Sequence, residues 1–381
     1  MRHTGTVAFL LAISLLLSGG GVAHAQSETS SWTSSDDIAA PAARGGARKI
    51  LKAVPVPVPN KTALPPVGAG VITTRAPAPP VPTLPSSVPS GDTTVAKTAA
   101  GSDPAYEAFD QGRYLTALEL AKAGAERGET QAPTLIGRIY QEGLGVPRDD
   151  VQAAQWYRRG VELGDVNAMF AFGVMLAEGG AIKKDHDGAA KMFEQAASKG
   201  HVTANYNLAL LFLSGEGKPE NPRRAAAHLR YAAESGLPNA QYDLATLYST
   251  GNGVDADAVE AARWFQRAAE AGMPEAQLDF GIILFQGKGL PPDQKRGAEM
   301  FRLAAEKGNP VAQDRLARCH AFGAGVPANL AEAAKWYLIA KSGGVEDKGM
   351  EQMVGKLAKA DRTKAEQAAI AWNERAAVLQ Q

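Results

Sequence analysis

One cysteine, no excess charge of either sign and one long apolar run limit what this chain can be. A lone thiol, Cys319, cannot form an internal disulfide, so packing alone must stabilise the fold. The 40 basic and 40 acidic residues give a net charge of zero at pH 7, which provides no overall field to attract nucleic acid or an anionic membrane. Since no second long apolar run follows the N-terminal one, we expect the mature protein not to span a membrane.

Recognised catalytic motifs are missing as well. The sequence contains no G-x-S-x-G or H-E-x-x-H motif, and the GEGK sequence at 215–218 lacks the spacing of a phosphate-binding loop. Cys319 and His320 provide two candidate metal ligands, whereas a zinc site needs more. We therefore predict no catalytic residues, no metal and no cofactor. An enzyme is the least favoured of three functional hypotheses.

The first 25 residues have the pattern of a secretory signal peptide. The apolar run 7–17 (VAFLLAISLLL) is shorter than a membrane span, and Ala23-His24-Ala25 is an A-x-A cleavage site. We predict cleavage after Ala25 and a periplasmic or secreted mature protein. The alternative is an uncleaved N-terminal anchor.

Residues 26–100 have the composition of a disordered, proline-rich linker. Because proline lacks a backbone donor and fixes φ, we expect this segment to be extended and without a core. Its basic residues are compatible with a tether that contacts an anionic envelope polymer, but a solvated spacer is the favoured interpretation. They are Arg44, Arg48, Lys49, Lys52, Lys61 and Arg75.

Glycine recurs with a period of 36 residues over the rest of the chain, at Gly128, Gly164, Gly200, Gly236, Gly272, Gly308 and Gly344. A period of this size is typical of a helical solenoid. We predict an all-α fold with a short N-terminal repeat at 101–128 and six helix-turn-helix repeats at 129–344. Residues 345–381 should form a helical C-terminal cap, with Asp361 as the N-cap of one helix and Trp372 on its inner face.

The other repeated positions have structural explanations. Gly143 and its equivalents should end the first helix of each repeat with a positive φ. A column of Asp and Asn suggests metal binding or acid–base chemistry at first sight, but N-capping of the second helix is the better interpretation. Its members are Asp149, Asp185, Asn221, Asp257, Asp293 and Asn329.

These columns make the chain resemble the Sel-one-like repeat (SLR) family, a relative of the tetratricopeptide repeats. The pattern is A-x-x-x-L-[GA]-x-x-Y-x-x-G-x-G-[VL]-x-x-[DN]-x-x-x-A-x-x-W-[FY]-x-x-A-A-x-x-G, and residues 239–272 fit it nearly throughout. Departures are Ala181 in place of glycine, His228 in place of an aromatic residue and His320 in place of tyrosine or phenylalanine. The resemblance implies a right-handed α/α superhelix whose concave face binds other proteins.

In tetratricopeptide-like repeats, one face of each first helix lines the concave groove. The resemblance implies the same arrangement here. The alternative is that the same side chains pack on a neighbouring helix. The predicted partner-binding residues are Phe170, Val174, Tyr206, Leu210, Leu213, Tyr242, Thr246, Ile282 and Phe285.

Two functional hypotheses are therefore favoured over an enzyme. The first is an exported scaffold or adaptor that binds a peptide or helix segment of a partner protein. The resemblance extends this to regulation of envelope signalling or polysaccharide production. The second is a periplasmic factor that binds the cell wall or a polysaccharide and is tethered by the proline-rich linker.

Overall fold

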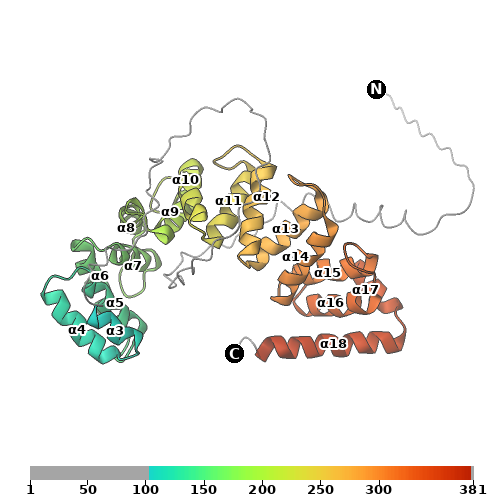
Figure 1. Cartoon of the computed structure of the whole chain (residues 1–381), viewed down its shortest axis with the longest axis horizontal. Coiled ribbons are helices and arrows are strands. Elements are labelled where there is room, and N and C mark those ends of the chain that lie inside the picture. The colour runs from blue at the N-terminus through green and yellow to red at the C-terminus, as the bar shows by residue number, and fades with distance from the viewer. Residues whose placement is uncertain (1–102, 379–381) are drawn as a thin grey trace, which may run out of the picture. The chain divides into compact units, whose positions relative to one another are not determined.

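The computed structural model describes residues 103–378, and every regular element in that range is an α-helix (Figure 1). The predicted signal peptide (1–25) and linker (26–100) lie outside the described residues. Within 103–378, no helix is both long and apolar enough to cross a membrane.

The helices follow one another with short turns between them. The N-terminal pair is α3 (Pro104–Asp110) and α4 (Tyr114–Glu126). The first helices of the six full repeats are α5 (Ala132–Glu142), α7 (Val166–Glu178), α9 (Val202–Ser214), α11 (Pro238–Thr250), α13 (Pro274–Gln286) and α15 (Pro310–Phe322). The second helices are α6 (Asp150–Glu162), α8 (His186–Ser198), α10 (Pro222–Glu234), α12 (Ala258–Glu270), α14 (Gln294–Glu306) and α16 (Leu330–Ser342). The chain continues with α17 (Lys348–Lys356) and α18 (Lys359–Val378).

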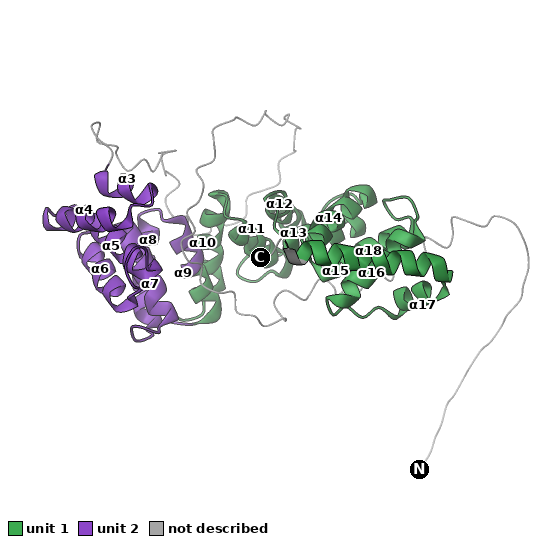
Figure 2. Ribbon diagram, turned by 90° about the horizontal axis from the view of Figure 1, so that it is seen from below, with its two compact units in different colours: residues 1–48, 208–215, 219–381 green, residues 49–207, 216–218 purple. Residues whose placement is uncertain are grey.

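The described chain divides into two compact units, which Figure 2 shows in different colours. Unit 2 holds residues 103–207 and 216–218, and unit 1 holds residues 208–215 and 219–378. The boundary falls within α9.

Both units are built from the same packing scheme. The two helices of a repeat pack on each other, as in α5 with α6 and α7 with α8 of unit 2, and α11 with α12, α13 with α14 and α15 with α16 of unit 1. Within a unit, a second helix also packs on the first helix of the next repeat, as in α6 with α7 and α12 with α13. Figure 1 shows this succession of helix pairs along the chain. The prediction of an all-α helical solenoid is therefore confirmed.

Local chemistry explains where the helices begin and end. All six members of the Asp/Asn column accept a hydrogen bond from a backbone N–H of the second helix, so the capping prediction is confirmed. Gly251, with φ 75°, ends α11 in the left-handed region that glycine tolerates best. Pro238, Pro274 and Pro310 occupy the first turns of their helices, where a proline removes no helical hydrogen bond.

The second glycine of a turn has a different role, because it touches the preceding repeat. A β-carbon built on Gly289 would lie 2.1 Å from the carbonyl oxygen of Ala258, the first residue of α12. The backbone of the preceding repeat also comes close to Gly253, at Pro222, and to Gly325, at Gln294, in unit 1. In unit 2 it comes close to Gly217, at His186. Each of these four turns therefore lies directly on the backbone of the repeat before it. Only a residue without a side chain fits there.

The C-terminal cap extends the apolar core of unit 1. Met350 and Val354 of α17 and Ala365 and Ala369 of α18 belong to the same buried cluster as residues of α15 and α16. Trp372 packs edge-on against Trp336 with 5.9 Å between ring centroids, so its predicted inward position is confirmed.

The prediction for Asp361 was wrong. Asp361 lies inside the first turn of α18, which begins at Lys359 rather than after Asp361. A carboxylate there still stabilises the helix, because the N-terminal turn of a helix carries partial positive charge.

The glycine contact between repeats predicts a specific loss of stability. Gly289→Ala should lower the free energy of unfolding by about 2–4 kcal/mol, because a methyl group meets a backbone carbonyl and φ is left-handed. Urea denaturation followed by circular dichroism measures this.

Gly308→Ala is the matched control. Gly308 has a φ of +88°, and a β-carbon there would meet no atom within 4 Å. It should therefore show only the backbone cost of about 1–2 kcal/mol. Equal losses in the two variants would contradict the role assigned to the contact between repeats.

Candidate functional site on the first helices

In unit 1, the first helices present a face that combines polar and apolar side chains. We call it the first-helix face and define it by the residues at two positions three apart, which neighbour each other on a helix. These are Asp243 and Thr246 on α11, Asp279 and Ile282 on α13, and Arg315 and Arg318 on α15. Asp243, Thr246, Asp279 and Arg318 are half-buried, whereas Ile282 and Arg315 are buried. The same two positions thus carry different chemistry in each repeat.

A hydrogen bond links α11 and α13 next to this face. The Tyr242 hydroxyl donates to the Asp279 carboxylate at 2.7 Å, and the Tyr242 ring packs edge-on against Phe265 of α12 at 5.3 Å. Thr246 donates its hydroxyl proton to the Tyr242 carbonyl one turn earlier at 3.1 Å. The Tyr242 side chain is thereby fixed in the core, and its hydroxyl forms a hydrogen bond to the next repeat.

The charge of the first-helix face changes along unit 1. Carboxylates occupy it in α11 and α13, and guanidinium groups occupy it in α15. Arg318 pairs with Asp314 and with Asp347, so part of the positive charge is already neutralised within the protein.

The predicted binding residues of unit 1 divide into two groups. Tyr242 and Ile282 are buried, with 5% and 8% of their surface exposed. Leu210, Leu213, Thr246 and Phe285 are half-buried, although the Phe285 ring also stacks on Phe301 at 5.3 Å.

The predicted binding residues of unit 2 are all buried. Phe170, Val174 and Tyr206 each have less than 5% of their surface exposed. The ring of Phe170 stacks on His201 at 4.5 Å and contacts Phe193 at 5.9 Å. These three side chains therefore pack in the core of unit 2, as the alternative interpretation proposed. The binding role stays a prediction, and it now depends mainly on the half-buried residues of unit 1.

Two repeated columns of unit 1 were not recognised in the sequence. Gln241, Gln277 and Gln313 are buried, and each donates from its amide nitrogen to an alanine carbonyl at the end of the preceding second helix at 3.1 Å. They satisfy carbonyls that a helix end otherwise leaves unpaired. The charged column Asp243, Asp279 and Arg315 was also missed, although its spacing of 36 residues is visible in the sequence.

The lone cysteine has the properties of a core residue. Cys319 is fully buried, and burial raises the pKa of its thiol far above the ordinary value. A thiol of this kind is a poor nucleophile and a poor metal ligand, because both roles need the thiolate. In the part of the chain that the structure describes, no three His, Cys, Asp or Glu residues are grouped so as to hold a metal ion.

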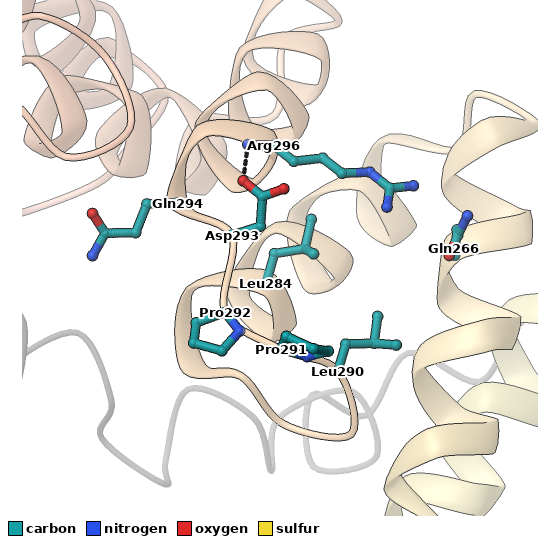
Figure 3. Close-up of a pocket in the computed structure, with 8 residues that line it drawn as sticks. All are labelled: Gln266, Leu284, Leu290, Pro291, Pro292, Asp293, Gln294 and Arg296. Carbon is teal, nitrogen blue, oxygen red and sulfur yellow. Dashed lines mark hydrogen bonds between the residues drawn. The ribbon is translucent and has the colours of Figure 1, made fainter.

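An open hollow of about 490 Å³ lies beside the turn between α13 and α14. Figure 3 shows Arg296 extending from α14 toward Gln266 of α12, whereas Gln294 points the other way. Leu290, Pro291 and Pro292 form its apolar side, and the Asp293 carboxylate accepts from the Arg296 backbone N–H at 2.9 Å. The single carboxylate of the hollow is thus occupied as a helix cap.

Comparison with known proteins identifies the repeats. The Sel1 repeat model matches six consecutive segments, 134–165, 166–201, 202–237, 238–273, 274–309 and 310–345, which together make up more than half of the chain. This chain belongs to the Sel1 repeat family. Proteins with Sel1 repeats are generally protein-interaction scaffolds and are typically not enzymes.

The solved structure of a second protein with Sel1 repeats agrees with this assignment. A Sel1 repeat protein from Oxalobacter formigenes is 29% identical, with a TM-score of 0.57, and the match covers 63% of this chain and 98% of that one. The protective antigen c5321 of uropathogenic Escherichia coli, which displays an SLR fold, is 27% identical with a TM-score of 0.48, and the match covers 71% of this chain and 68% of that one. No curated protein matches the chain.

The histidine next to Phe170 predicts a dependence of stability on pH. His201 Nδ1 accepts from the Ala204 N–H at 3.1 Å, and burial lowers the pKa of His201 to about 4. Between pH 6.5 and 4, His201 binds a proton more readily in the unfolded state than in the folded state. The contribution of His201 to the free energy of unfolding should therefore be complete above pH 6.5. It should then fall by about 2 kcal/mol as the pH falls toward 4, after allowance for partial exposure.

His201→Asn keeps a side-chain acceptor for the Ala204 N–H but does not titrate. In this variant, that part of the pH dependence should disappear from urea denaturation curves recorded between pH 4 and 7. An unchanged pH dependence in the variant would contradict the assignment to His201.

Proposed function

We propose that this Sel1 repeat protein is an exported, non-enzymatic adaptor that holds a segment of a partner protein against the first-helix face of unit 1. Membership of a family of interaction scaffolds supports the general role. The pattern at residues 1–25 supports export, since it has an apolar run and an A-x-A site. The same proposal includes a role for the protein in regulating envelope signalling or polysaccharide production.

We place the binding surface on this face because its residues differ from repeat to repeat, whereas other first-helix positions keep the same residue. Positions that pack repeats together keep one residue type, such as the glutamines 241, 277 and 313. The first-helix face instead presents Asp and Thr, then Asp and Ile, then Arg and Arg in successive repeats. Those residues of the face that are half-buried, such as Thr246, can acquire specificity for a partner.

The composition of this face favours a polypeptide segment as the ligand. It carries the carboxylates of Asp243 and Asp279, and the half-buried Leu213 and Phe285 at other positions of the first helices add apolar surface. A peptide or helix that carries basic and apolar side chains fits such a surface.

Thr246 provides the most direct test, because it is half-buried and its hydroxyl bonds within its own helix, to the Tyr242 carbonyl. Thr246→Arg should reduce capture of the partner from an envelope extract at least tenfold, since a long charged side chain would obstruct the face. Affinity capture followed by quantitative mass spectrometry measures the loss.

Val259→Arg is the control, because Val259 lies on a second helix with 43% of its surface exposed. Both variants should keep the helical circular dichroism spectrum of the wild type. Loss of capture in Val259→Arg with full capture in Thr246→Arg would place the binding surface on the second helices instead.

The basic residues of segment 26–100 favour a second candidate function, binding to an anionic cell-wall polymer. Purified sacculi should then sediment the full chain but not a variant that lacks 26–100. Equal sedimentation of the two would exclude a tethering role for the segment.

A further inference from the structure

Helix α17 takes the place of the first helix of a further repeat. It follows Gly344, the last glycine of the 36-residue period, but it has only nine residues. The Asp347 carboxylate caps it by accepting from the Gly349 and Met350 N–H groups at 2.8 and 3.0 Å. Met350 and Val354 then complete the apolar core at the C-terminal end of unit 1.

Charged side chains are buried where α15 meets the start of α17. Arg318 of α15 pairs with Asp314 on its own helix, with 3.3 Å between Nε and Oδ2, and also with the Asp347 carboxylate. Only 9% of the Asp314 side chain and 7% of the Asp347 side chain are exposed. Oδ1 of Asp314 is buried and has no hydrogen-bond partner. Buried charges of this kind stabilise a fold only when their hydrogen bonds are complete.

The surroundings of Asp314 favour a proton on its carboxyl group. Burial, together with the nearby charge of Asp347, raises the pKa of Asp314 to about 6, although Arg318 and Arg315 oppose the shift. A protonated Asp314 can donate a hydrogen bond to the Asp347 carboxylate, which an ionised Asp314 cannot do.

The other groups at this junction come from α16 and α17. Tyr337 of α16 contacts the Asp347 backbone, and burial raises its pKa, so its hydroxyl stays neutral near pH 6. Lys341 of α16 and Glu351 of α17 form an exposed ion pair beside it. His320 follows two residues after Arg318 on α15, and burial lowers its pKa.

We propose that Asp314 is a proton-operated latch on the C-terminal cap, which holds α17 against α15 when the carboxyl group is protonated and loosens when it is ionised. A carboxyl group whose pKa is higher in the closed state than in the unfolded state stabilises the closed state. This stabilisation is complete at pH values below the unfolded pKa. This stabilisation is lost as pH rises through the pKa of the closed state. The cap should therefore be tight in mild acid and should open more often above pH 6.

Hydrogen–deuterium exchange of the full chain between pH 4 and 7 tests the latch. After correction for intrinsic exchange rates, protection of peptides from 348–378 should fall about a hundredfold as the pH rises from 4 to 7. Protection of peptides from α12, in the same unit, serves as the internal reference and should change much less.

Asp314→Asn replaces the titrating group with a permanent hydrogen-bond donor. In this variant, protection of 348–378 should change less than about threefold over the same range, after the same correction. Asp255→Asn, at an exposed turn residue, should behave as the wild type.

Two results would overturn the proposal. One is the wild-type pH dependence persisting in Asp314→Asn. The other is protection that rises with pH in the wild type, because that sign belongs to a group with a lowered pKa such as His320.

Discussion

The contact between a turn glycine and the backbone of the preceding repeat constrains how the repeats of unit 1 stack. At Gly253, Gly289 and Gly325, no β-carbon fits between the turn and the first residue of the previous second helix. The amide column at 241, 277 and 313 fixes the other end of the same second helices through their terminal carbonyls. With both ends of a second helix held by the next repeat, the spacing of the repeats is determined by backbone contacts. The half-buried side chains of the first helices can then vary without disturbing it.

Much of this architecture could be predicted from the sequence because it depends on local chemistry. Gly251 ends a helix with a positive φ wherever it occurs, and Asp257 caps a helix wherever free N–H groups follow it. Ala181 shows the limit of this reasoning. Where alanine replaces the second glycine, the turn changes, and Gly179 adopts a ψ of −152° instead of the 19° to 36° of Gly143, Gly251, Gly287 and Gly323.

The candidate site was harder to predict, because an apolar residue on a first helix can serve the core or a ligand. Phe170 and Tyr206 have the side chains expected of a binding groove, yet both are buried in unit 2. The burial of Phe170 depends on His201, which no local pattern relates to it. Tyr242 is likewise fixed by an aspartate 37 residues away, which only the register of neighbouring helices brings into contact. Polar residues beside the expected apolar row, such as Asp279, therefore define the face better than the aromatic residues do.

In the proposed function, repeats stack through constant contacts and specificity belongs to the first-helix face of unit 1. Site-specific photo-crosslinking tests it most directly, because a benzophenone amino acid reports contact without disrupting the fold. Placed at position 246 of α11, it should crosslink the bound partner, whereas at the exposed position 259 of α12 it should not. Crosslinking from position 259 with none from position 246 would contradict the account.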